Sequence, residues 1–188
     1  MTDAAAELPE IHGWSAGTWA IDPDHSQVGF SVRHLMGKVH GRFTEFEGRL
    51  VTTEDPAHSS VTAEIALASI DTASEMRDNH LRSADFFDVA ATPTMRFISS
   101  GIRQAGDSWV IAGKLTIREN TEPVEIDVEF LGVDPDGLQG ETRIGFTGKT
   151  SISRREFGVG FGLWDDGRKI VVGDRVDIVL DVQAVLEI

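Results

Sequence analysis

Apolar and polar residues alternate along most of this chain, and the alternation is clearest near its beginning. Val28, Phe30 and Val32 fall on one face of an extended segment, while Gly29 and Ser31 fall on the other. A period of two residues is typical of a β-strand with one buried face. The pattern returns at intervals through the chain, separated by turn residues, and it predicts a protein built of long strands.

The predicted strands follow one another with a single interruption. They are residues 18–22, 25–34, 42–53, 61–70, 94–100, 109–117, 124–133, 141–152 and 176–187. A turn or bulge is expected at residues 22–24 and a bend between Gly37 and Gly41. Gly106-Asp107 and residues 135–137 are turn sequences of the kind that join antiparallel neighbours.

Residues 71–89 interrupt the strands with a helical pattern. Residues 77–83 are good helix formers, and Thr72 or Ser74 can cap the helix. Residues 85–88 can form a second helical turn that places Phe86 and Phe87 against the sheet. We therefore expect one helical insertion, in one or two pieces, that covers or plugs part of the sheet.

Roughly eight long strands without alternating helices favour an all-β fold, either an antiparallel barrel or a sandwich. The barrel is favoured because about eight strands leave an interior that can hold one small ligand. Strands longer than the usual five or six residues make such a barrel tall and narrow. Residues 1–16 are acidic and alanine-rich and are predicted to be a flexible tail, with one barrel domain over residues 17–188.

Composition narrows the choice of partners. The 188 residues carry a formal net charge of −14 and include no cysteine. The charge argues against a nucleic acid partner, and against attachment to an anionic membrane by charge alone. The lack of cysteine excludes disulfides and thiolate chemistry. Residues 1–14 have no secretory signal pattern and no segment is long and apolar enough to span a membrane, so we expect a cytoplasmic protein.

Several blocks of the sequence resemble those of the YceI-like family, in the same order. The first covers residues 19–35, which read WAIDPDHSQVGFSVRHL, and the central ones cover residues 69–72, 77–78 and 80–89. Later blocks cover residues 113–117, 121–124, 153–154 and 157–160. The resemblance extends over about residues 18–187 and implies an extended, eight-stranded, antiparallel lipocalin-like barrel with a short helical insertion. It also implies that the barrel binds a polyisoprenoid or similar amphiphile inside.

Alternation and resemblance together predict a tube lined by apolar side chains. Filling such a tube with hydrocarbon is favourable by roughly 25 cal/mol per Å² of apolar surface buried. The alternative is that these side chains pack a solid core or cover the outside. The candidate lining residues are Phe30, Val32, Phe46, Leu50, Ile65, Leu67, Phe97, Ile111, Leu115, Ile126, Val128, Phe130, Ile144, Phe146, Ile178 and Leu180.

A polar group at the end of such a ligand needs hydrogen-bond donors at the mouth of the tube. Arginine presents planar, paired donors that suit phosphate or carbonyl oxygens. The candidates for this contact are Arg33, His34, Arg77, His80 and Arg82. The alternative is that Arg77 and Arg82 pair with acidic residues of the same segment and fasten the helix.

We therefore expect a non-enzymatic carrier that sequesters a polyisoprenoid or quinone-like lipid, needs no cofactor, and releases its ligand by loop or helix movement. One alternative is an enzyme that acts on such a lipid with His25, His34 or His80 as acid–base, and another is a solid-cored interaction module. The histidines lack metal-site spacing, and residues 13–17 match a hydrolase elbow without its strand and helix. The expected partners are the lipophilic molecule and, through rim loops or free edges, a second copy in a homodimer.

Overall fold

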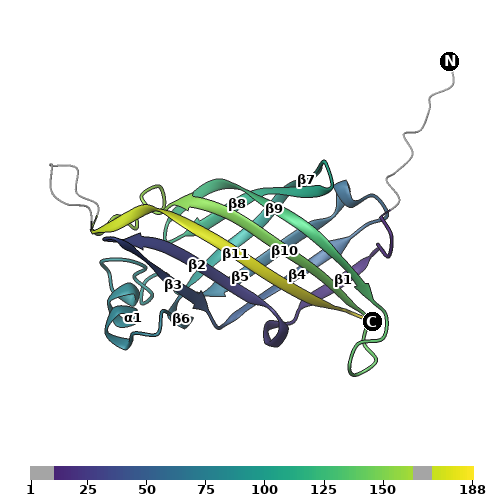
Figure 1. Ribbon diagram of the computed structural model, residues 1–188, viewed down its shortest axis with the longest axis horizontal. Helices are drawn as coiled ribbons and strands as arrows, with labels where there is room; N and C mark the ends of the chain where they lie inside the picture. Colours follow the sequence, from purple (N-terminus) through teal and green to yellow (C-terminus); the bar gives the residue numbers. More distant parts are fainter. Residues whose placement is uncertain (1–10, 163–170) are drawn as a thin grey trace, which may run out of the picture.

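A single antiparallel sheet curls into a closed barrel in the computed structural model, which describes residues 11–162 and 171–188 (Figure 1). The strands are β1 (Gly17–Ile21), β2 (Gln27–His34), β3 (Gly37–Phe43), β4 (Phe46–Thr52), β5 (Ser60–Ala66), β6 (Ile70–Asp71), β7 (Thr94–Ala105), β8 (Ser108–Ile117), β9 (Asn120–Asp134), β10 (Arg143–Ser153) and β11 (Val172–Leu186). The helix α1 spans Glu75–Arg82, and short 3₁₀ turns lie at Pro23–His25, Pro56–His58 and Leu67–Ser69.

The eleven segments form an eight-stranded barrel because some of them continue one another. Strands β1 and β2 lie one after the other along β11, where Ile21 pairs with Ala184 and Gln27 pairs with Asp181. Strands β3 and β4 continue each other in the same way along β2 and β1, and β5 and β6 do so along β4 and β3. The pairing of β1 with both β4 and β11 closes the ring. The predicted all-β barrel is confirmed.

The antiparallel pairing gives the barrel two distinct ends. The first, which we call the terminus end, carries the C-terminus, the β7–β8 turn and the β9–β10 connection (Figure 1). The second, which we call the helix end, carries α1, the β2–β3 turn and residues 154–162 (Figure 1). Each end has its own packed cluster: Trp19 and Ile144 are fully buried at the terminus end, and Leu67, Ile70 and Phe157 at the helix end.

Two predicted strands are interrupted in the structure. Residues 42–53 are not one strand, because Thr44 leaves the ladder and both its amide and its hydroxyl donate to the carbonyl oxygen of Ser69. Residues 61–70 are likewise broken after Ala66 by the 3₁₀ turn at Leu67–Ser69. These breaks let the chain bend at the edge of the helix end.

The predicted bend between Gly37 and Gly41 is also wrong. Gly37 pairs with His34 and Gly41 pairs with Phe30, so both glycines belong to the regular strand β3. The reversal falls instead on Leu35 and Met36. Gly41 is a glycine because β3 passes close to Phe30, and a side chain at position 41 would collide with the ring of Phe30.

The helical insertion is present, but residues 85–88 form turns and not a second helical piece. Ser83 accepts hydrogen bonds from the amides of Phe86 and Asp88 at 3.0 and 2.9 Å. Asp88 has a positive φ of 49°, which ends helical geometry at this point. Phe86 and Phe87 nevertheless pack against the interior of the barrel as expected.

The predicted tail lies partly outside the described residues, which begin at residue 11. Within the described part, Trp14 packs against the barrel. Its Nε1 donates to the carbonyl oxygen of Thr53 at 2.8 Å, and its ring meets that of Phe130 edge-on at 5.4 Å. Packed structure therefore begins before Gly17. No helix among the described residues is long and apolar enough to cross a membrane.

Candidate functional site

Two neighbouring cavities lie inside the barrel, and residues of the clusters at its two ends form part of their walls. Cavity 1 has a volume of about 210 Å³, and cavity 2 has a volume of about 120 Å³. The walls of both are almost entirely apolar side chains. Because a dry, apolar space is more favourably filled by hydrocarbon than by water, the interior suits a lipophilic guest.

Cavity 1 extends from the middle of the barrel to the terminus end. Its walls come from the inward-facing positions of most strands, with Trp109, Ile111, Phe130 and Phe146 among them. Trp14 lies against the rings of Phe130 and Phe146 at this end. The residues at its wall also include serines and threonines: Ser26, Thr52, Ser59, Ser60, Thr147 and Thr150.

Cavity 2 lies at the helix end, and the helical insertion forms part of its wall. Leu81 of α1, together with Phe86 and Phe87 after it, covers one side, and Phe157 and Val159 cover another. The ring of Phe86 also contacts those of His80 and Phe161, with centroids 5.0 and 5.2 Å apart. This aromatic cluster joins the insertion to residues 154–162.

Four residues line both cavities, so they mark the place where the cavities adjoin, which we call the constriction: Val28, Met95, Leu115 and Ile178. Met95 is the most adaptable of them, because its unbranched side chain has several rotatable bonds. A guest longer than one cavity must pass this point. The two cavities are therefore separate compartments of one interior.

The predicted lining residues all lie on the walls of these cavities except Leu67 and Ile144. Leu67 is fully buried in the cluster at the helix end, because the 3₁₀ turn removes it from the strand. Ile144 is only 1% exposed and packs with Trp19 and Ala184 in the cluster at the terminus end. Whether a ligand contacts the others stays a prediction.

Some wall residues were not predicted. Trp109 shares the inward face of β8 with Ile111, so alternation alone could have indicated it. Trp14 could not have been indicated in this way, because it lies outside any strand and reaches the cavity only through the path of the N-terminal segment.

None of the five residues predicted to contact a polar ligand group lines either cavity. Arg33 and His34 are exposed at the end of β2. Arg77 donates through Nε and Nη2 to the hydroxyl and carbonyl oxygens of Thr72, each at 2.7 Å. Arg82 donates to the carbonyl oxygens of Ala68 and Ile70 at 2.8 and 2.9 Å.

The two arginines of α1 therefore fasten the helix to residues 68–72, as the alternative interpretation held. Their partners are backbone carbonyls and Thr72, however, and not the acidic residues of the same segment. Asp78 instead accepts from the amide of Thr72 at 3.0 Å, and His80 lies 2.8 Å from Asp85.

Arg154 is the one charged side chain on a cavity wall in the described part of the chain, and sequence reasoning missed its role. It is 6% exposed, and it donates to the carbonyl oxygens of Val159, Phe161, Val172 and Gly173 at 2.7 to 3.0 Å. Burial lowers the pKa of Arg154, against the opposing effect of Asp174. With its donors committed to these carbonyls, Arg154 ties residues 159–161 to the start of β11 at the wall of cavity 2.

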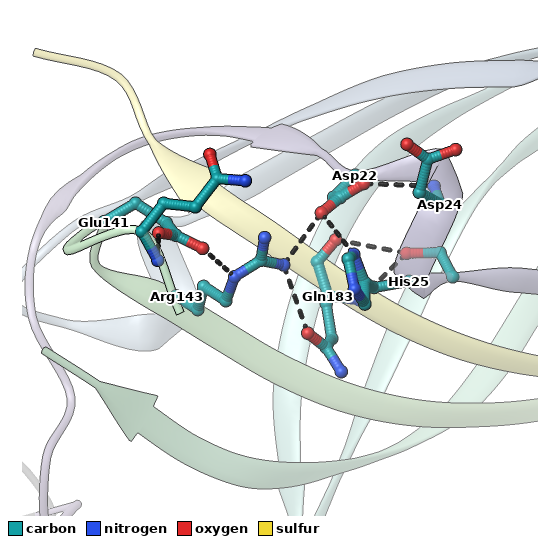
Figure 2. Close-up of polar contacts among 8 residues, drawn as sticks. Asp22, Asp24, His25, Glu141, Arg143 and Gln183 are labelled. Carbon is teal, nitrogen blue, oxygen red and sulfur yellow. Dashed lines mark hydrogen bonds and ion pairs between the residues drawn. The ribbon is translucent and has the colours of Figure 1, made fainter. Parts of the chain in front are cut away.

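A network of polar side chains joins the segment between β1 and β2 to β10 and β11 (Figure 2). Arg143 donates through Nη1 to Asp22 at 2.8 Å and through Nε to Glu141 at 2.5 Å. His25 also lies 2.8 Å from Asp22. The hydroxyl of Ser26 bridges the amide and carbonyl of Gln183, at 3.0 and 3.1 Å, where the ladder between the strands is interrupted.

This network shifts the ionisation of its members. Burial raises the pKa of Asp22, but hydrogen bonds from Arg143 and His25 outweigh it and lower that pKa below its ordinary value. Backbone hydrogen bonds and Arg143 lower the pKa of Glu141. The charged forms of both carboxyls are therefore the forms that hold this seam closed.

The histidines offer no acid–base group to the interior. No histidine lines either cavity, and His25, His34 and His80 all lie outside them. Among the described residues, no group of three or more His, Cys, Asp or Glu side chains has the arrangement to hold a metal ion.

Comparison with known proteins gives the family. The sequence model of the YceI-like domain matches residues 19–184. A UPF0312 protein of Pseudomonas paraeruginosa is 33% identical over 174 residues, which cover 90% of this chain and 87% of that protein. A UPF0312 protein of Staphylococcus epidermidis is 34% identical over 158 residues, covering 83% of this chain and 90% of that protein.

Solved structures share the fold. BcnA of Burkholderia cenocepacia superimposes with a TM-score of 0.75 at 28% identity, covering 87% of this chain and 98% of that one. A polyisoprenoid binding domain from Saccharophagus degradans superimposes with a TM-score of 0.66 at 14% identity, covering 92% of this chain and 100% of that domain. With the match over residues 19–184 and relatives that align along most of their length, this chain belongs to the YceI-like domain family.

Proposed function

We propose that this protein binds a lipophilic chain molecule of the isoprenoid type inside its barrel and keeps it from water. The observation that carries the proposal is the interior itself, with two adjacent cavities whose walls are almost wholly apolar. Ligand sites are usually concave and apolar with a few polar groups. A thin, unbranched or methyl-branched chain fits a narrow tube with a constriction better than a compact, rigid molecule does.

The chemistry of the walls favours binding and sequestration over catalysis. Among the described residues, no titratable side chain lines cavity 1, and cavity 2 has only Arg154, whose donors are committed to backbone carbonyls. General acid–base catalysis needs a titratable group within hydrogen-bond reach of the reacting atom. The hydroxyl groups on the wall of cavity 1 lack a neighbouring base that would make them nucleophiles.

The fold gives further support. The Saccharophagus degradans domain that shares this fold is described as a polyisoprenoid binding domain. At 14% identity the likeness extends to the fold alone, so the proposal for this chain depends on the walls of its own cavities.

The test is uptake of isoprenoid alcohols by the purified full chain, measured by native mass spectrometry. Ala63 lines cavity 1, whereas its neighbour Thr62 is exposed on the outer face of β5. Ala63→Phe fills part of the cavity and should reduce uptake at least tenfold. Thr62→Phe is the matched control and should leave uptake unchanged. Equal uptake by both variants, or none by the unaltered protein, would contradict the proposal.

A further inference from the structure

We propose that the turn between β2 and β3 docks this protein, helix end first, on an anionic lipid bilayer. We call residues 33–38 the docking tip. The inference rests on the proposed function and extends it, because it identifies the surface with which the barrel exchanges its lipophilic guest. It stands on the shape of the tip, on the charge around it and on its position beside cavity 2.

The docking tip presents two long apolar side chains to solvent. Met36 is 98% exposed and Leu35 is 41% exposed. Leu35 also has a positive φ of 52°, a conformation that residues with a side chain rarely adopt. The turn is held in this form because the amide of Leu35 donates to Val171 at 2.9 Å and Nε of Arg33 donates to Leu35 at 3.4 Å. Exposed apolar residues on a rigid turn indicate an interaction surface.

The segment that carries the tip is basic, although Asp177 pairs with Lys38 and Asp71 pairs with Arg42. Residues 28–44 contain Arg33, Lys38 and Arg42 and no acidic residue, although the chain carries a net charge of −14. Arg33 and Lys38 lie on either side of the two apolar residues, separated from them by His34 and Gly37, and both are exposed. Basic groups near an anionic membrane surface are attracted to it, and the attraction falls off within a Debye length. Local charge therefore governs contact at the tip.

The acidic residues favour the same orientation. Exposed carboxylates gather at the terminus end, in its turns and at the C-terminus: Glu54, Asp107, Asp134, Asp136 and Glu187. These groups are repelled from an anionic surface, so they turn the long barrel with the helix end towards it. The helix end also carries exposed carboxylates, but none of them belongs to the docking tip: Glu75, Asp85, Glu119 and Glu156.

The arrangement fits a bilayer better than an acidic protein. Two adjacent apolar side chains project between cations, which is the order of apolar and charged layers at the edge of a membrane. The tip also adjoins cavity 2, because Val32 and Val172 line that cavity and Val171 holds Leu35. A guest leaving cavity 2 would therefore emerge close to the membrane surface.

Flotation with vesicles tests the proposal with the full chain and no added ligand. We expect binding to vesicles of three parts phosphatidylcholine and one part phosphatidylglycerol, weaker binding to pure phosphatidylcholine, and loss of binding in high salt. Met36→Asp should weaken binding about tenfold or more. The matched control is Leu138→Asp, since Leu138 is 96% exposed but lies at the terminus end. Equal binding by the two variants would overturn the proposal.

A second measurement locates the contact. The chain has no cysteine, so Met36→Cys and Leu138→Cys can each carry one environment-sensitive dye. Anionic vesicles should shift the emission of the dye at position 36 to the blue and leave the dye at position 138 unchanged. If the dye at position 36 responded to soluble polyglutamate as strongly as to anionic vesicles, an acidic protein partner would be favoured and the proposal of a bilayer would be overturned.

The experiments distinguish a failure of the docking proposal from a failure of the proposed binding function. Met36→Asp should take up isoprenoid alcohols normally in vesicle-free solution and exchange them slowly with anionic vesicles. If the unaltered protein takes up the alcohols but never floats with vesicles, the docking proposal fails and the binding function stands. If it floats with vesicles but takes up no alcohol, the binding function fails and the membrane contact stands.

Discussion

The indole Nε1 of Trp19 donates a hydrogen bond to Oγ1 of Thr52 at 2.8 Å, and both residues are buried. The Thr52 hydroxyl donates onward to the carbonyl oxygen of Ser15 at 2.7 Å. Strands β1 and β4 and the segment before β1 are thereby joined at the terminus end of the barrel, at the wall of cavity 1.

Thr52→Val should lower the free energy of unfolding by about 1–3 kcal/mol, because it leaves a buried indole N–H without an acceptor. Denaturant titration measures this change. Thr52→Ser keeps the hydroxyl and should recover most of the loss. If both variants lost the same stability, the methyl group and not the hydrogen bond would be responsible.

Arg143→Gln should destabilise the protein in a pH-dependent way. The pKa values of Asp22 and Glu141 are lowered in the folded protein, so their stabilisation is complete above the ordinary carboxyl pKa of about 4 and is lost as the pH falls below it. The difference in unfolding free energy between variant and unaltered protein should therefore be largest near neutral pH and should shrink below about pH 4.

The control for Arg143 is Arg103→Gln. Arg103 pairs with Glu125 on the outer face, where both side chains are more than half exposed, so its loss should change stability little at any pH. A difference for Arg143→Gln that stayed constant from neutral to acid pH would show that the carboxyl ionisation plays no part.

Arg154→Met should loosen the helix end. It removes donors from four backbone carbonyls, and the expected loss of stability is about 2–4 kcal/mol. Hydrogen exchange should accelerate around Val159 and at the start of β11. Arg118→Met is the comparison, because Arg118 makes a single hydrogen bond to Gly158 and should have a smaller effect. If hydrogen exchange near Val159 were unchanged, Arg154 would not be what holds residues 159–161 to β11.

Met95→Ala should join the two cavities, since Met95 is part of the constriction between them. We expect a stability loss of about 2–4 kcal/mol, together with a shift in uptake towards longer isoprenoid alcohols, such as geranylgeraniol over geraniol. Met95→Leu keeps the volume and should change both properties little. A preference for chain length that is the same in all three proteins would count against the constriction as a selective element.

The strands could be predicted because their inward faces repeat every second residue. Val28, Phe30 and Val32 illustrate this, since all three line the cavities as one face of β2. The breaks at Thr44 and Leu67 could not be predicted in the same way. They depend on hydrogen bonds between segments far apart in the sequence, such as Thr44 with Ser69, and no local pattern contains that information.

The residues of the candidate site likewise fall into those that the sequence predicts and those that it does not. Alternation and the family resemblance together predict Ile111 and Phe146 as lining residues, and both lie on the wall of cavity 1. Arg154 and Trp14 were missed. Their roles depend on where remote carbonyls and rings lie after folding, so a charged residue in a turn and an aromatic residue in a tail gave no signal.

By itself, the sequence determined that long strands each carry one apolar face, since the periodicity of burial is a local property of each strand. Only the tertiary structure decided that these faces surround two adjacent cavities, and that the basic turn lies at the end opposite the C-terminus. Those features arise from register and strand order, which set which side chains meet across the barrel and which turns share an end.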